Sequence, residues 1–134
     1  MTELNTDFHA LANSIKQWAK ELGFADAGIC ATDLSQDEPH LLHFIEQGYH
    51  GQMEYRASPG TLRTRPQELV PGTLRVISLR MPYLGETPKF QETLANPEAA
   101  YISRYALGRD YHKLLRKRLQ QLAERIKQHT GDLG

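Results

Sequence analysis

Apolar residues recur every three to four positions near the start of the chain and again near its end. This spacing places them on one face of an amphipathic helix. The first stripe predicts a helix that begins near Thr6 or Asp7, stops at Gly23 and has an apolar face of Phe8, Leu11, Ala12, Ile15, Trp18, Ala19 and Leu22. The second predicts a long helix from near Asp110, with an apolar face of Tyr111, Leu114, Leu115, Leu119, Leu122 and Ile126. We expect each helix to turn its apolar face toward the core.

Between these helices, two segments have the pattern of β-strands. Residues 25–31 are short, small and apolar, which indicates a buried strand in which Gly28 allows close backbone approach. Residues 74–81 alternate polar and apolar side chains and end at a proline. Residues 99–105 are a further strand or an extended segment that enters the last helix. The order helix, then strand predicts the α/β or α+β fold class, with a small sheet packed by amphipathic helices.

The remaining segments are less regular. A short second helix is predicted around residues 41–45, with Ser35 as its N-cap and Gly48 at its end. Residues 49–71 are rich in glycine and proline, which predicts a long irregular excursion with at most one helical turn near residues 52–55. Residues 85–97 have the pattern of a mobile loop. These few elements would form only a thin sheet. The chain is therefore either the first part of a longer protein or a protein that ends in a short C-terminal tail.

Composition restricts the class of protein. The chain has 134 residues, of which 40% are hydrophobic and 24% are charged, as expected for one soluble domain with a single core. The first residues lack a secretory signal, and no apolar run approaches the ~20 residues that a membrane span needs, so we expect a cytoplasmic protein. The only cysteine, Cys30, excludes an internal disulfide and any iron–sulfur cluster or cysteine-rich zinc site built from this chain alone.

Charge is balanced overall but uneven along the chain. There are 16 basic and 16 acidic residues, yet residues 100–134 contain 8 basic and only 3 acidic ones. Most of this positive charge lies on the last predicted helix. Such a helix suits the backbone of a nucleic acid, but it is also typical of an ordinary solvated surface.

Candidate chemistry is concentrated in residues 104–113, the run RYALGRDYHK. This run lies where an extended segment passes into a helix, whose N-terminal end attracts anions. Within it, Asp110 is either the N-cap of the helix or a ligand or proton-transfer group, and its residue type favours the cap. Nucleotide-binding, zincin and serine-hydrolase motifs are absent. His40 and His43 are three residues apart but have no obvious third partner, which favours exposed polar positions over a metal site.

A second group of candidates precedes the predicted strand at residues 74–81. Arg63 and Arg65 can bind phosphate or amide oxygens, or they can be exposed loop residues without a specific partner. Upstream lies a group of aromatic and methionine residues, Tyr49, Met53 and Tyr55. Such side chains can line the site of a flat cofactor, but they more often serve only in packing.

Four runs in order, RTRP at 63–66, ELVPG at 68–72, RVIS at 75–78 and RYALGRDYHK, closely resemble the N-terminal region of the epoxyqueuosine reductases. That family comprises cobalamin-dependent, iron–sulfur oxidoreductases related to reductive dehalogenases. It catalyses the last step of queuosine formation, the reduction of an epoxide on the modified wobble base of tRNA. The resemblance implies that residues 1–134 form a single cobalamin-binding domain, the N-terminal fragment of a cytoplasmic enzyme.

The resemblance also implies site residues. Arg63 and Ser103 match positions that contact cobalamin, and Asp110, Tyr111 and His112 lie near the same pocket in the family. The two [4Fe–4S] clusters of the family belong to a C-terminal ferredoxin-like part, whose cysteines this chain lacks. The main proton donor is expected beyond Gly134, so Asp110 is a secondary catalytic candidate. The fragment alone is therefore expected to be inactive.

The expected partners follow from the same resemblance: tRNA carrying epoxyqueuosine and the missing C-terminal domain, with no membrane, and a monomeric protein. The alternative is a standalone, non-catalytic RNA-binding module whose basic C-terminal helix, from Arg109 to Lys127, holds an RNA backbone. Loss of corrinoid on removal of Arg63 would favour the enzyme. A smaller salt dependence of RNA binding on removal of Arg116 and Arg118 would favour the module.

Overall fold

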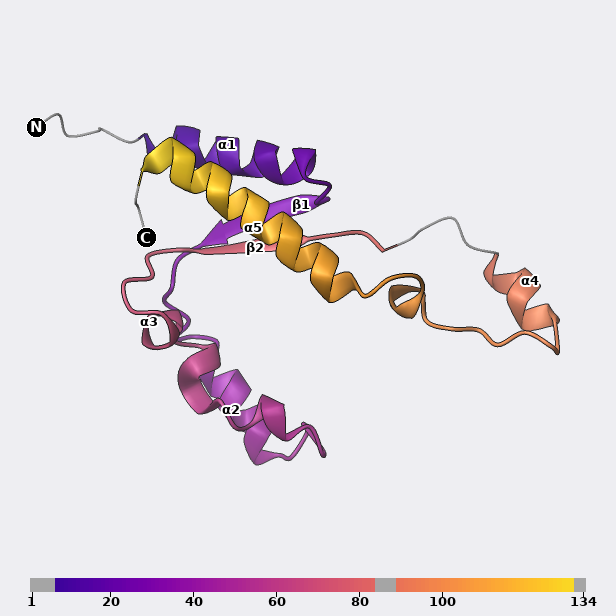
Figure 1. Ribbon diagram of the computed structural model, residues 1–134. Helices are drawn as coiled ribbons and strands as arrows, with labels where there is room; N and C mark the ends of the chain where they lie inside the picture. Colours follow the sequence, from indigo (N-terminus) through magenta and orange to yellow (C-terminus); the bar gives the residue numbers. More distant parts are fainter. Residues whose placement is uncertain (1–6, 84–88, 132–134) are drawn as a thin grey trace, which may run out of the picture. The chain divides into compact units, whose positions relative to one another are not determined.

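The contacts of the chain divide it into two units (Figure 1). The computed structural model describes residues 7–83 and 89–131. The terminal unit comprises the residues up to Ala27 and those from Leu79 onward, and the central unit comprises Gly28–Ser78. The strands β1 (Asp26–Cys30) and β2 (Val76–Arg80) each contain a boundary between the units.

The two strands form one antiparallel sheet. At one end, the backbone N–H of Ala25 donates to the carbonyl of Arg80 over 2.7 Å. At the other end, the Cys30 thiol lies 3.8 Å from the carbonyl oxygen of Val76. Both predicted strands are confirmed within their expected ranges, but the burial expected for the first is wrong, because Ala27 is the only buried residue of β1. The expected close approach at Gly28 is wrong, because a Cβ built there meets no atom within 4 Å.

The core of the terminal unit forms where α1 (Phe8–Glu21) packs beside α5 (Tyr111–Thr130) (Figure 1). Asp7 begins α1 by accepting hydrogen bonds from the backbone N–H groups of residues 9 and 10. The buried cluster consists of Ala19, Phe24, Ala27 and Leu122, with Trp18, Leu22, Leu79, Met81, Leu115 and Ile126 packed against it. Both long helices are thus confirmed. The predicted apolar positions of α1 other than Phe8 are at least partly buried, but Tyr111, Leu114 and Leu119 of α5 are exposed, so only the other half of its predicted apolar face meets the core.

Two basic side chains of α5 take part in this packing. Arg125 forms a 2.6 Å ion pair with Glu21 of α1. Arg118 donates to the sulfur of Met81 over 3.0 Å, and its guanidinium lies over Gly23, where a Cβ would come within 2.8 Å of it. The positive face expected for α5 is therefore smaller than its sequence suggests, because these two guanidinium groups bind within the unit.

The central unit is more helical than the sequence predicts. It contains α2 (Glu38–Glu46), two 3-10 helices, η1 (Glu54–Arg56) and η2 (Gly60–Arg63), and the short α3 (Pro66–Leu69). Three of these lie in the segment that was expected to be irregular.

The start of α2 also differs from expectation. Asp37, not Ser35, occupies the N-cap position of α2. The backbone N–H of Ser35 instead donates to the Asp33 carboxylate over 3.0 Å, in a turn before the helix. Gly48 follows the end of α2 with a φ of 66°, as its predicted role at the end of the helix requires.

Two further expectations for the terminal unit are corrected. Residues 90–95, expected in a mobile loop, form α4 (Phe90–Ala95), while residues 84–88 of that loop lie outside the described residues. Residues 99–105 form no strand and pass into the 3-10 helix η3 (Arg104–Ala106). The Phe90 ring meets the Tyr101 ring edge to face at 5.2 Å, so the segment contacts α4 instead of a strand. Among the described residues, no helix is long and apolar enough to cross a membrane.

Candidate functional site

The entry to α5 is a sharp junction built by three local features. The chain leaves η3 in extended conformation and turns at Gly108, whose φ of 83° is readily adopted only by glycine. Asp110 then begins α5, and its carboxylate accepts the backbone N–H of His112 over 2.9 Å. The predicted N-cap is therefore confirmed, and it fixes the direction of the first turn of the helix.

The same carboxylate oxygen of Asp110 also lies 2.8 Å from Nδ1 of His112. The hydrogen bond from the His112 backbone, followed by the one from its ring, lowers the pKa of Asp110 below its ordinary value. An acid with a lowered pKa is ionised at neutral pH and accepts hydrogen bonds. This geometry supports the capping role, and the role of Asp110 as a secondary proton donor stays a prediction.

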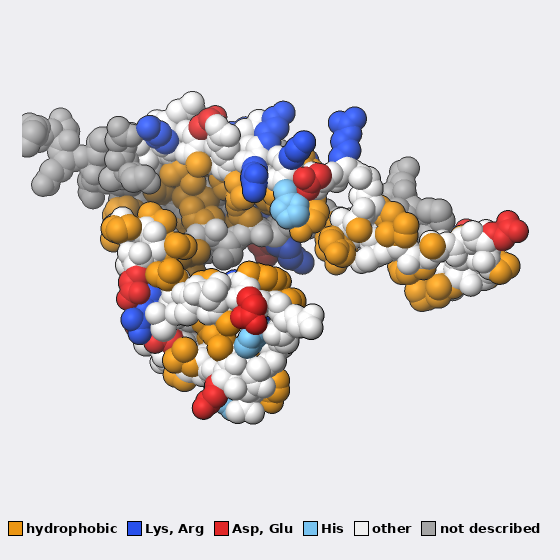
Figure 2. All heavy atoms as spheres, turned by 60° about the horizontal axis from the view of Figure 1, so that its bottom comes forward, with side chains coloured by type: hydrophobic (Ala, Val, Ile, Leu, Met, Phe, Trp, Pro, Cys, Tyr) orange, Lys and Arg blue, Asp and Glu red, His pale blue; other side chains and the backbone are white. Residues whose placement is uncertain are grey.

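Three rings gather beside this cap in an aromatic cluster of Tyr105, Tyr111 and His112. The Tyr111 ring stacks on the His112 ring with centroids 4.1 Å apart, and it meets the Tyr105 ring edge to face at 6.1 Å. Both tyrosines are substantially exposed. Figure 2 shows apolar side chains reaching the surface in many places. An exposed group of stacked rings can cover the flat face of a large ligand.

Ser103 lies immediately before η3, two residues from the nearest ring of the cluster. It occupies the N-cap position of η3, but its side chain makes no capping hydrogen bond. The residue is exposed. The structure therefore brings four of the five predicted site residues into one segment of the terminal unit, from Ser103 to His112.

The fifth residue, Arg63, belongs to the central unit. It is the last residue of η2, and its Nη2 donates to the backbone carbonyl of Tyr55 over 2.7 Å. The Tyr55 ring is exposed, its hydroxyl contacts the sulfur of Met53, and Arg56 lies over its face. Tyr55 and Met53 thus have exposed side chains, and Arg63 binds the backbone of Tyr55.

Sequence reasoning missed one functional candidate, Glu38. Its carboxylate accepts from Nε and Nη2 of Arg65, each over 2.9 Å, and from the Thr64 hydroxyl over 2.7 Å. The hydrogen bonds from Arg65 and then from Thr64 lower its pKa from 4.5 to about 2. This interaction is fully present above the ordinary pKa and is lost as the pH falls through about 2. Nothing in the local sequence signals the contact, because an acidic residue in the first turn of a helix is common.

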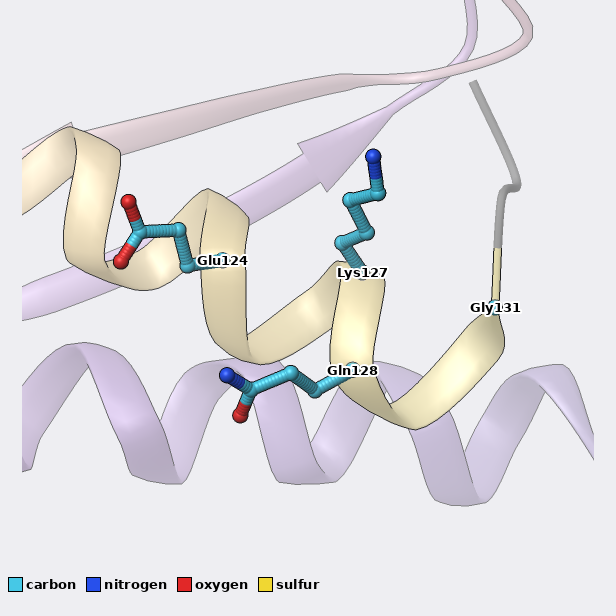
Figure 3. A pocket seen from close by; sticks show the side chains of 4 residues that line it. All are labelled: Glu124, Lys127, Gln128 and Gly131. Carbon is cyan, nitrogen blue, oxygen red and sulfur yellow. The ribbon is translucent and has the colours of Figure 1, made fainter.

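Two other places in the described chain do not form a site. His40 and His43 are exposed, and no group of three metal-ligating side chains occurs in residues 7–83 and 89–131. A hollow of about 390 Å³ lies at the end of α5, lined by Glu124, Lys127, Gln128 and Gly131. Figure 3 shows that its three longer side chains do not converge on one point.

Comparison with known proteins points to one family. The family model "Epoxyqueuosine reductase QueG, DUF1730" matches residues 63–133. The epoxyqueuosine reductase of Pseudomonas aeruginosa is 60% identical over 124 residues, covering 92% of this chain and 34% of the relative. That of Escherichia coli is 58% identical over 128 residues, covering 96% of this chain and 34% of the relative.

A solved structure agrees in fold. The structure of epoxyqueuosine reductase from Streptococcus thermophilus has a TM-score of 0.66 to this chain at 23% sequence identity. The likeness covers 90% of this chain and 32% of the solved chain. The chain thus spans about a third of the length of the relatives that it matches.

Proposed function

This chain belongs to the epoxyqueuosine reductase QueG family, and from that premise we propose that it is the N-terminal, cobalamin-binding third of an epoxyqueuosine reductase. The whole protein would reduce epoxyqueuosine to queuosine at the wobble position of tRNA in the cytoplasm, acting as a monomer. Identity of 60% over 92% of the chain carries this proposal. The standalone RNA-binding module is not favoured, because the identity extends over nearly the whole chain and not only over its basic helix.

The candidate residues fit a corrinoid by their chemistry. Cobalamin is a flat macrocycle fringed with amides, and when bound it would supply a low-potential cobalt for reduction of the epoxide. The Arg63 guanidinium and the Ser103 hydroxyl suit amide groups at its rim. The exposed tyrosines of the aromatic cluster suit an apolar face. We assign Asp110 to holding the first turn of α5 and the His112 ring in place.

The remaining components of the reaction would lie outside this chain. Two [4Fe–4S] clusters need several cysteine ligands, whereas this sequence contains only Cys30. Opening an epoxide also requires a proton for the oxygen, and the ionised Asp110 is poorly suited to provide it. We therefore expect the 134-residue chain to bind the corrinoid without turning over substrate.

The activity is tested in a bacterium that lacks its own epoxyqueuosine reductase. The longer protein that contains this sequence should convert epoxyqueuosine to queuosine in tRNA, as measured by mass spectrometry of tRNA nucleosides. The 134-residue chain alone should leave epoxyqueuosine unreduced. Persistence of epoxyqueuosine with the longer protein would contradict the proposed activity, and full conversion by the short chain would contradict the need for the missing parts.

Corrinoid binding is tested on the chain itself by titration with hydroxocobalamin, followed by absorption and equilibrium dialysis. Replacement of Arg63 by alanine is expected to weaken binding about ten- to hundredfold, because it removes a charged hydrogen-bond donor. Arg75→Ala is the matched control, since this exposed arginine of the same unit hydrogen-bonds only to its neighbouring carbonyl in the structure described. Equal losses for both variants would show a general charge effect and refute the specific role of Arg63.

A further inference from the structure

The two residues that follow Arg63 are joined by side-chain hydrogen bonds to another element of the central unit. Thr64 is only 8% exposed, and it is the one buried polar residue among those described. Its hydroxyl and the Arg65 guanidinium both bind the carboxylate of Glu38, at the start of α2. Thr64 and Arg65, the two residues after Arg63, therefore both bind Glu38, which precedes them by 26 and 27 residues in the sequence.

We propose that Glu38 is a positioning residue, which holds the turn between η2 and α3 against α2 and thereby sets how Arg63 is presented to the corrinoid. This inference rests on the proposed corrinoid binding by Arg63. Glu38 would not touch the ligand itself. It would act through Thr64 and Arg65, which continue directly from the last residue of η2.

The geometry requires a carboxylate at this position. Oε1 and Oε2 of Glu38 each accept one N–H of Arg65, which is the paired arrangement of a guanidinium fork on a carboxylate. Oε2 accepts the Thr64 hydroxyl as well, so both oxygens are used. Glutamine has only one acceptor oxygen and would turn an N–H₂ group toward the guanidinium, so it cannot reproduce the three contacts.

Apolar packing offers little alternative support for this turn. All the buried apolar residues of the described chain belong to the terminal unit, and the central unit contains none. Arg65 also pairs with Glu68 over 3.1 Å, but Arg65 is the N-cap of α3 and Glu68 lies within it, so this pair does not connect the turn to α2. The contact of Arg63 with the Tyr55 carbonyl fixes only its guanidinium. Hydrogen bonds from the N–H and hydroxyl of Thr64 to the Thr61 carbonyl also hold this stretch locally. Among the side-chain hydrogen bonds of the described residues, however, only those of Glu38 tie residues 64 and 65 to α2.

The test combines binding with a structural measurement. Hydroxocobalamin affinity is measured for the unchanged chain, Glu38→Gln, Arg63→Ala and the double variant, with Glu46→Gln as the control at the exposed far end of α2. We expect Glu38→Gln to weaken binding about five- to tenfold, because an ordered contact residue becomes mobile. In the Arg63→Ala background the same change should have less than about a twofold effect, since residues that act through one another are not additive.

Amide hydrogen exchange of residues 60–69 supplies the readout that does not depend on the corrinoid. Exchange should accelerate in Glu38→Gln and stay unchanged in Glu46→Gln, while the circular dichroism spectra of both match the unchanged chain. Unaltered exchange in Glu38→Gln overturns the inference whatever the affinities. The inference is also overturned if Glu38→Gln binds hydroxocobalamin with full affinity, or if its loss of affinity adds to that of Arg63→Ala in the double variant. Either result leaves the proposed function standing. If the unchanged chain does not bind hydroxocobalamin, the corrinoid-binding proposal fails, and the positioning role fails with it.

Discussion

Replacement of Phe24 by alanine is expected to lower the free energy of unfolding by about 3–5 kcal/mol, because a buried aromatic side chain is removed and a cavity remains. Phe24 is 3% exposed and belongs to the buried cluster of the terminal unit. It follows Gly23, whose φ of 88° turns the chain back after α1, and its N–H donates to the carbonyl of Ala19 over 3.0 Å. These features fix its backbone, so the surrounding structure cannot easily collapse into the space.

The measurement is urea-induced unfolding followed by circular dichroism. Phe8→Ala is the matched control, since Phe8 is 72% exposed at the first position of α1. The free energy of unfolding of this control is expected to change by less than about 0.5 kcal/mol, as for most surface substitutions. Similar losses for the two phenylalanines would show that Phe24 does not lie in the core. The total stability of a domain is itself only about 5–15 kcal/mol, so Phe24→Ala can abolish the cooperative transition.

Leu122→Ala is expected to lower the free energy of unfolding by about 2–5 kcal/mol. Leu122 is 3% exposed and is the one buried residue of α5 among those described. It supplies the contact of this helix with the same cluster that contains Ala19 and Phe24. Alanine has a higher helix propensity than leucine, so a loss of stability reports lost packing and not a weaker helix.

Leu119→Ala is the control for this second change, because Leu119 lies one turn earlier on α5 and is 44% exposed. Thermal and urea unfolding of both variants should separate them clearly, with the larger loss at position 122. Equal losses would mean that Leu119 packs against the core as closely as Leu122 does, contrary to the structure. The apolar stripe of α5 contains both leucines at helical spacing, so their sequence pattern does not distinguish them.

The elements that could be predicted are those whose cause is local. Helical spacing of apolar residues identified α1 and α5, and alternation identified β2, because these periods arise from backbone geometry. The cap at Asp110 was also predictable, since it needs only its own side chain and an N–H two residues later. Short helices such as η2 and α3 were missed, because three or four residues are too few to show a period.

Part of the candidate site was also local. Ser103, Asp110, Tyr111 and His112 are neighbours in sequence, so their proximity needed little tertiary information. Their ring contacts did need it, since the Tyr105 and Tyr111 rings meet only because the chain turns at Gly108. Arg63 was a candidate from its sequence run, but its hydrogen bond to the Tyr55 carbonyl could not be read from the sequence.

Residue identity and short-range periodicity suffice to predict the family, the two long helices, the two strands and the junction at Asp110. The burial of Phe24, the packing of Arg118 within the terminal unit and the contact of Glu38 with Arg65 came instead from the folded chain. Each of these depends on residues distant in sequence, up to 95 positions apart for Gly23 and Arg118. A side chain's burial and partners are set by where the chain returns in space, and no local pattern contains that information.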